Sequence, residues 1–173
     1  KEIFTKFGGH KLAAGLSIPE ERITEMRRRL NGNTRLTEDD LIEKVSIDMQ
    51  MPLSYANERI VQELEFLEPF GKGNTKPIFV EKDIEILRAD ILGKNRKVLK
   101  LKVRDAKGCC IDAMYFGDLQ KFQVYIEEQY GMQAWENLLQ ARPCGVRMAF
   151  TYYPSVNEFR GTKTGQIVIQ NYR

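Results

Sequence analysis

The chain has 173 residues, of which 42% are hydrophobic and 29% are charged, and its formal net charge is +3. This composition is typical of a globular protein of one or two domains that needs no disulfide framework or structural metal. Three cysteines, two of them adjacent, and the lack of a membrane-spanning run or signal peptide predict a cytoplasmic protein that does not contact membranes. A single histidine, His10, and the lack of clustered metal ligands argue against a self-contained metallohydrolase.

The first 34 residues predict a turn, a short strand and a helix. A turn is expected at Gly8-Gly9, followed by one or two helical turns of small residues and an apolar strand. Pro19 then opens a helix that has acidic residues in its first turn and ends near residues 31–32.

Residues 37–77 add a loop, a strand, a second helix and a linker. An acidic loop is expected over residues 37–40, and the alternation at 45–49 indicates a strand with one buried face. A helix should run from Ser54, its N-cap, to Leu67. Residues 68–77 are rich in Pro, Gly and Asn, and predict a domain boundary near Lys76.

Strand signals then recur along the rest of the chain. They cover residues 78–88, 98–104, 110–116, 146–153 and 166–169. One or two helices are expected between the third and fourth strands, over residues 119–139. Five strands with a helix at this place have the order of an OB-fold. The predicted fold class is therefore α+β, with a small α/β unit over residues 1–76 and a five-stranded OB-fold barrel with an inserted helical segment over 77–173.

Most of the basic excess lies between Lys94 and Lys107, where seven cations are opposed by one acid, Asp105. Alternation along the second strand places three of these cations on one face, about 6–7 Å apart. They are Lys100, Lys102 and Arg104. Such a row suits the phosphates of a single-stranded nucleic acid, with aromatic side chains as stacking platforms. The platform candidates are Tyr115, Phe116, Tyr152, Tyr153 and Phe159. The alternative is an ordinary solvated strand whose aromatics belong to the core.

Gly8-Gly9-His10 is a second candidate site. Two glycines let the backbone approach an anion closely, and an imidazole can donate a hydrogen bond to a phosphate oxygen. The alternative interpretation is a surface turn beside a lone histidine.

Three motifs occur in a fixed order. They are FGGHKLAAGLSI at residues 7–18, LEPFGKGN at 67–74, and a terminal pattern of Asn157, Phe159, Gly161, Gln166 and Ile169. In this order they resemble the C-terminal half of a bacterial RecJ-type single-stranded-DNA-specific exonuclease, in which the end of a DHH-associated domain precedes an OB-fold domain. The resemblance covers essentially the whole chain. Thr75 departs from it, since the family usually has proline there.

The resemblance implies a 5′-to-3′ exonuclease of recombination and repair that uses Mn²⁺ or Mg²⁺. Its metal ligands would lie in a preceding domain, so no catalytic or metal-binding residue is expected in this chain. Gly8, Gly9 and His10 would hold the phosphate near the scissile bond. The OB-fold would bind single-stranded DNA through phosphate contacts and two stacking residues. These residues are Lys100, Lys102, Arg104, Arg147 and Arg160 for phosphate, and Tyr115 and Tyr153 for stacking.

Other notable residues are given structural roles. Gly161 is expected at positive φ in the last turn, with Asn157 and Gln166 bonding buried backbone groups, and Phe70 is expected to pack the two domains together. The adjacent cysteines have no activating cluster. The protein is expected to be a monomer with possible repair-protein partners. Two alternatives remain open: a stand-alone single-strand-binding or interaction module, and another DHH-superfamily phosphoesterase.

Overall fold

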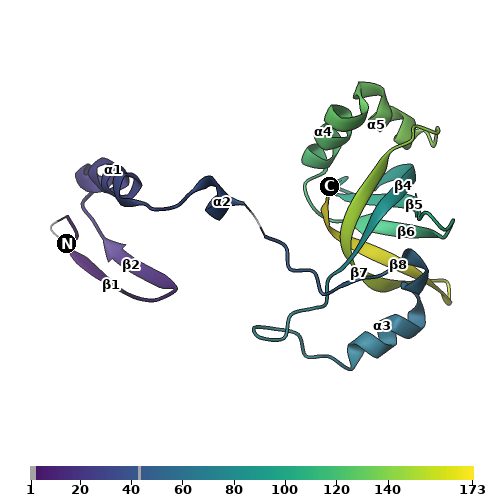
Figure 1. Ribbon diagram of the computed structural model, residues 1–173, viewed down its shortest axis with the longest axis horizontal. Coiled ribbons are helices and arrows are strands. Elements are labelled where there is room, and N and C mark those ends of the chain that lie inside the picture. The colour runs from purple at the N-terminus through teal and green to yellow at the C-terminus, as the bar shows by residue number, and fades with distance from the viewer. Residues whose placement is uncertain (1–2, 43) are drawn as a thin grey trace. The chain divides into compact units, whose positions relative to one another are not determined.

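The computed structural model describes residues 3–42 and 44–173, and the chain divides into two compact units, Lys1–Val45 and Ser46–Arg173 (Figure 1). The division lies 31 residues before the boundary that the linker composition predicts. No helix within the described residues is both long and apolar enough to cross a membrane.

The first unit contains a β-hairpin and two helices. Strands β1 (Lys6–His10) and β2 (Ala13–Ser17) pair antiparallel, with Gly8 opposite Gly15 and Gly9 opposite Ala14. The predicted Gly-Gly turn is therefore wrong, as are the helical turns expected after it. The glycines lie inside a strand, where the absence of a Cβ lets the two backbones come together: a Cβ on Gly9 would stand 2.6 Å from the Ala13 carbonyl oxygen.

The helix after Pro19 is confirmed. It begins as a 3₁₀ turn (η1, Glu20–Arg22) and continues as α1 (Ile23–Asn33). A one-turn helix, α2 (Glu38–Leu41), replaces the expected acidic loop. It forms because Thr37 and Asp40 make a capping box, in which the Asp40 carboxylate accepts a hydrogen bond of 2.8 Å from the Thr37 backbone N–H.

The second unit is a closed five-stranded barrel, which confirms the predicted α+β class and OB-fold. Its strands are β4 (Phe79–Leu92), β5 (Val98–Arg104), β6 (Cys110–Tyr115), β7 (Arg147–Phe159) and β8 (Thr162–Tyr172). The order is β4-β5-β6-β8-β7, and pairing of β4 with β7 closes the barrel. Helices α4 (Leu119–Tyr130) and α5 (Met132–Leu139) separate β6 from β7, and they meet at Gly131, where φ is 91°.

Residues 46–76 belong to the barrel unit. Only β3 (Met49–Gln50) is a strand, paired parallel to β4, so the longer half-buried strand expected at 45–49 is wrong. A 3₁₀ turn, η2 (Leu53–Tyr55), precedes α3 (Glu58–Glu65), which starts later than predicted. Its N-cap is Asn57 and not Ser54, because the Asn57 side chain accepts a hydrogen bond of 3.1 Å from the Ile60 N–H.

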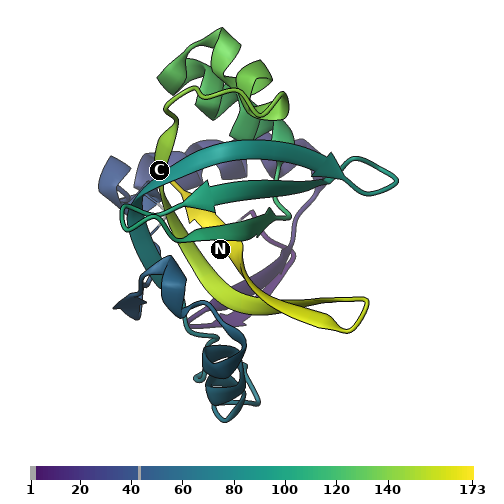
Figure 2. The same ribbon diagram turned by 90° about the vertical axis from the view of Figure 1, so that its right-hand side faces the viewer.

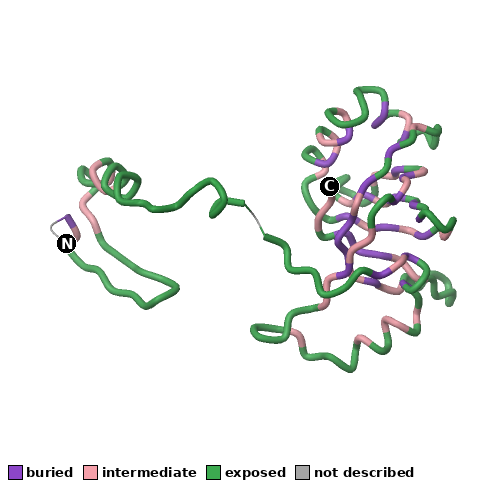
Figure 3. Tube along the Cα trace, in the orientation of Figure 1, coloured by how far each residue is buried: buried purple, intermediate pink, exposed green. Residues whose placement is uncertain are grey.

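The core explains why these residues join the barrel. Leu53 and Ala56 are buried in the same apolar cluster as the inward side chains of the barrel strands and of α4 and α5. The Tyr152 hydroxyl donates a buried hydrogen bond to the Met51 carbonyl. Helix α3 and the pair α4–α5 lie at opposite ends of the barrel (Figure 2), and buried residues gather between them (Figure 3).

The last two strands are longer than predicted. They form a hairpin whose tip contains Arg160 at φ 51° and Gly161 at φ 77°, a two-residue turn that matches the twist of the flanking strands. The expectation of positive φ at Gly161 is therefore confirmed. Residues 157–164 are exposed, so no apolar pattern marks this part of the hairpin as strand.

Candidate nucleic-acid interface

The outward side chains of four neighbouring strands form rows across one face of the barrel, here called the outer face. Residues paired across a sheet point to the same side, so the strand register defines these rows. One row contains Lys100, Met114, Val168 and Tyr153, and the next contains Lys102, Asp112, Gln166 and Ser155. The sequence-predicted cations of β5 and the aromatic Tyr153 of β7 therefore share one face.

An acid that the sequence reading did not pair with them stands between the two lysines of β5. The Asp112 carboxylate lies 2.9 Å from the Lys100 ammonium and 3.0 Å from the Lys102 ammonium. Burial opposes ionisation of Asp112, but the hydrogen bonds from both lysines outweigh it and hold the pKa of that carboxyl below its ordinary value. At neutral pH one of the two positive charges at the middle of the outer face is therefore compensated.

Arg104 and Arg147 share a second acid. Glu85 of β4 lies 2.8 Å from the Arg104 guanidinium and 3.4 Å from that of Arg147, which also pairs with Asp83 at 2.9 Å. The hydrogen bond that Arg104 donates to Glu85 raises the pKa of Arg104, and the one that Arg147 donates to Asp83 raises the pKa of Arg147. Register places Arg147, Glu85 and Arg104 in one row, so both predicted cations flank a carboxylate.

Tyr115 does not offer a stacking face, and this expectation is wrong. It is 8% exposed, and its ring packs 5.4 Å from that of Phe122 and 5.7 Å from that of Tyr172. Along β6 the inward positions are Ile111, Ala113 and Tyr115. The next side chain, Phe116, is 61% exposed.

Phe116 stands beside the free cations of the β4–β5 loop. It lines a shallow cleft with Arg96 and Lys97, and no described acid lies within ion-pair distance of those two side chains. Asp118 lines the same cleft without an ion pair to either cation, so its charged side chains sum to +1. An exposed ring beside cations combines the two groups that bind single-stranded nucleic acids. The sequence contained a signal for this: every second residue of β6 up to Tyr115 is apolar and points inward, so the next residue, Phe116, is expected to point outward and to be the better stacking candidate.

The β7–β8 turn carries a second pair of an aromatic and a cation. The Arg160 guanidinium lies 5.2 Å from the ring centroid of Phe159, which is 65% exposed. Loops at these two places, β4–β5 and β7–β8, bound the ligand face of OB-folds. The outer face is thus flanked at both ends by exposed cation–aromatic pairs.

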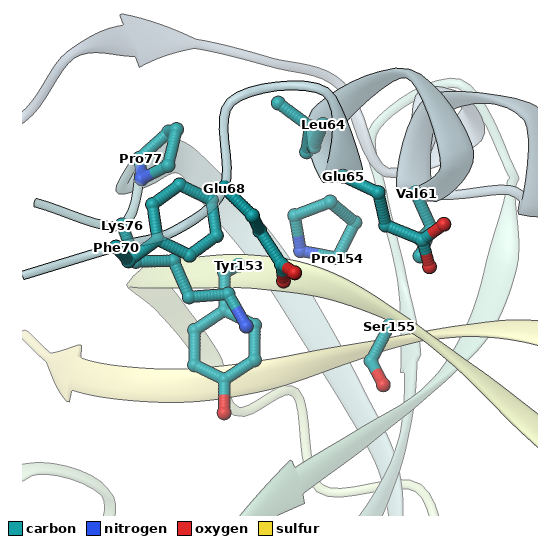
Figure 4. A pocket seen from close by; sticks show the side chains of 10 residues that line it. All are labelled: Val61, Leu64, Glu65, Glu68, Phe70, Lys76, Pro77, Tyr153, Pro154 and Ser155. Atoms are coloured by element: carbon teal, nitrogen blue, oxygen red, sulfur yellow. The ribbon is translucent and has the colours of Figure 1, made fainter. Parts of the chain in front are cut away.

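Tyr153 has a neighbour that the sequence reading missed. The Lys76 ammonium lies 3.8 Å from the centroid of the Tyr153 ring, at one side of a cavity between α3, the linker and β7 (Figure 4). Phe70 lines the same cavity. Phe70 therefore lies between α3 and β7, which the sequence placed in different domains and which belong to one compact unit in the structure.

The glycine-histidine motif lies on the exposed hairpin of the first unit. The His10 Nδ1 accepts a hydrogen bond of 3.3 Å from the Leu12 N–H, and Gly8 and Gly9 are exposed. Strand β2 follows the glycines in place of a helix, so no helix N-terminus adds its positive end to this motif. Backbone and imidazole remain accessible to a phosphate.

Metal and thiol chemistry find little support. Residues 3–42 and 44–173 contain no group of three or more His, Cys, Asp or Glu side chains arranged to hold a metal ion. The three cysteines are free, and burial raises the pKa of the Cys109 thiol, which agrees with its expected inertness.

The family model of the RecJ OB domain matches residues 47–171. The chain belongs to the RecJ OB domain family. The OB domain therefore includes α3 and the linker, in agreement with the compact unit that begins at Ser46.

RecJ proteins resemble the chain beyond the OB domain. The single-stranded-DNA-specific exonuclease RecJ of Bacillus subtilis is 26% identical over 175 residues, which cover 99% of this chain and 20% of that protein. RecJ of Haemophilus influenzae is 26% identical over 95% of this chain and 26% of its own length. The crystal structure of Thermus thermophilus RecJ with Mg²⁺ has the same fold, with a TM-score of 0.68 at 22% identity, over 99% of this chain and 23% of that one. The chain spans about a quarter or less of these RecJ relatives.

Proposed function

We propose that this chain is the OB-domain part of a RecJ-type exonuclease and that it binds single-stranded DNA across the outer face. The observation that carries the proposal is the arrangement of that face: lysines of β5 at its centre and exposed cation–aromatic pairs in the two flanking loops. The relatives' activity on single-stranded DNA supports the choice of ligand. In this proposal the protein is a cytoplasmic monomer that serves DNA recombination and repair together with repair-protein partners.

The hydrolytic step is proposed to need residues outside this chain. Mg²⁺ and Mn²⁺ occur in the crystal structures of Thermus thermophilus RecJ. The described residues do not fit a metal centre, because they contain no suitable group of ligands. In this proposal the metal-dependent chemistry belongs to a DHH domain.

The first unit is proposed to be the end of a DHH-associated domain. Gly8, Gly9 and His10 would contact a DNA phosphate there, through exposed backbone and the His10 imidazole. The OB domain would hold another part of the same strand. Its proposed contacts are Lys100, Lys102, Arg104, Arg147 and Arg160 to phosphate, with Tyr153 and Phe116 as aromatic partners.

The test is the salt dependence of oligonucleotide binding. Fluorescence anisotropy with a labelled oligothymidylate should give a log–log slope of about −3.5, at about −0.7 for each of the five proposed phosphate contacts on a single strand. The variant Lys100→Glu with Lys102→Glu should weaken binding and flatten the slope. Lys121→Glu with Arg142→Glu, on α4 and in the loop after α5, makes the same change in net charge and should have a much smaller effect. Equal losses in both double variants would place the binding site elsewhere.

A further inference from the structure

The cavity in Figure 4 has the chemistry of a site for a cation and not for an anion. Its walls are apolar on the sides of α3, β7 and the linker. Its polar groups include two carboxylates at the end of α3, from Glu65 and Glu68, and one ammonium, from Lys76. No described basic side chain lies within ion-pair distance of either carboxylate. The charged side chains that line the cavity therefore sum to one negative charge, and the Lys163 ammonium outside the cavity interacts with the Glu65 carboxylate without pairing with it.

The other acids of this helix are already paired. Glu58 lies 2.9 Å from the Lys163 ammonium, and Glu63 lies 2.8 Å from the Arg59 guanidinium. The two carboxylates that lack an ion pair are thus the two that line the cavity. A phosphate would meet repulsion there, so this cavity does not extend the proposed DNA site although Tyr153 contributes to both.

The chain itself shows that the cavity accepts a cation. The Lys76 ammonium lies over the Tyr153 ring, 3.8 Å from its centroid, a geometry in which the ring quadrupole attracts positive charge. Phe70 supplies a second aromatic side chain, and Pro77 and Pro154 supply flat apolar walls. In Figure 4 the Glu68 carboxylate points toward Pro154, beside the space that the Lys76 side chain leaves open.

We propose that this cavity binds an arginine side chain of a partner protein. A planar guanidinium stacks on aromatic and proline surfaces and binds carboxylates through two parallel hydrogen bonds, whereas an ammonium does neither. The Glu65 and Glu68 carboxylates supply the negative charge, and the walls contact the faces of the guanidinium. The site lies beside the outer face, so a bound partner would stand next to the DNA without taking its phosphate contacts.

The proposal is tested on the whole chain with a minimal probe. The ¹⁵N-labelled protein is titrated with N-acetyl-arginine methylamide and, separately, with its uncharged analogue N-acetyl-citrulline methylamide. Arginine should shift backbone amide resonances around the cavity, at Glu65, Phe70 and Ser155, with millimolar affinity. Citrulline should shift them at least threefold more weakly. Equal effects of the two probes, shifts spread over the whole protein, or no shifts at all would overturn the proposal.

Charge variants give the second measurement. Glu65→Gln with Glu68→Gln, both exposed, should weaken arginine binding about fivefold to tenfold, and Glu63→Gln with Glu58→Gln should leave it within twofold. The same cavity variant should bind oligothymidylate at least as well as the wild type. Loss of arginine binding in the Lys100→Glu, Lys102→Glu variant would contradict the separation of the two sites. Failure of oligonucleotide binding in the wild type would refute only the proposed DNA function.

Discussion

Replacing Asp112 with asparagine should strengthen the binding of single-stranded DNA. The carboxylate sits about 3 Å from the ammonium groups of Lys100 and Lys102. A phosphate that contacts either lysine at about 2.8 Å therefore lies about 6 Å from Asp112. Asparagine keeps the shape of the side chain and a hydrogen-bond acceptor, and removes the charge that competes with phosphate.

The size of the effect follows from Coulomb's law. Two unit charges 6 Å apart in water repel by about 0.7 kcal/mol, and salt at 0.1 M, with a Debye length of about 10 Å, reduces this to about 0.4 kcal/mol. Two phosphates, one at each lysine, give about 0.8 kcal/mol, or roughly fourfold tighter binding. At 0.01 M salt the screening is weaker and the expected gain rises to roughly sevenfold.

Fluorescence anisotropy with labelled oligothymidylate at 0.01 and 0.1 M salt measures this gain. The control is Glu136→Gln, which removes one negative charge from the surface of α5, away from the outer face. Unchanged or weaker binding by Asp112→Asn, or an equal gain in the control, would refute the placement of phosphates at these lysines. Two part-exposed ion pairs contribute about 0.2–1 kcal/mol each, so the melting temperature should fall by only a few degrees.

Three further predictions follow from single features. Phe116→Ala should weaken oligonucleotide binding by about tenfold, because base–aromatic stacking contributes about 1–3 kcal/mol; Phe66→Ala, 88% exposed at the end of α3, is the control with no expected effect. Burial raises the pKa of Glu81 in the folded protein. The carboxyl therefore ionises more readily in the unfolded chain, and the free energy of unfolding falls as the pH rises above the ordinary carboxyl pKa. In Glu81→Gln the side-chain carbonyl can still accept the hydrogen bond from the Leu53 N–H. The melting temperature of this variant relative to the wild type should therefore increase from pH 4 to pH 7, and a difference that does not depend on pH would contradict this. The chain alone should not degrade oligonucleotides with Mn²⁺, as gel assays of a contaminant-free sample can check.

Local periodicity predicted the parts of the fold that depend only on neighbours in sequence. The alternation in residues 98–104 gave the bounds of β5 and the outward direction of Lys100, Lys102 and Arg104. Their acidic partners come from β6 and β4, 10 to 19 residues away, and depend on strand register. Charge compensation of this face is a tertiary property, so the sequence showed a basic row where the structure has ion pairs.

The glycine pair Gly8-Gly9 shows a second limit of prediction from local sequence. Gly8-Gly9 allows a turn and also a close approach of two strands, because both need the same missing Cβ. The choice depends on the pairing of Gly8 with Gly15, which places a small residue opposite each glycine. The sequence therefore indicated correctly that the backbone at Gly8-Gly9 has an unusual conformational or steric requirement, but the predicted structure, a turn, was wrong.

The predicted domain boundary near Lys76 is a loop that does not divide the hydrophobic core. Residues 68–77 form a loop, held by a turn in which the Asn74 side chain donates to the carbonyls of Leu67 and Pro69. The core continues across it, since Leu53 and Ala56 pack with the barrel. Composition detects the loop, but only packing shows that both sides of it belong to one unit.

The outer face has paired cations at its centre and unpaired cations at the β4–β5 loop, and this difference affects how tightly each place would hold a DNA phosphate. At the centre of the outer face a phosphate must share Lys100 or Lys102 with the Asp112 carboxylate, which repels it and weakens the net Coulomb attraction. At the β4–β5 loop, Arg96 and Lys97 are free to make the first contact. We infer that the centre holds phosphates weakly and exchanges them readily. Contacts of this kind would let a bound strand change its position along the outer face.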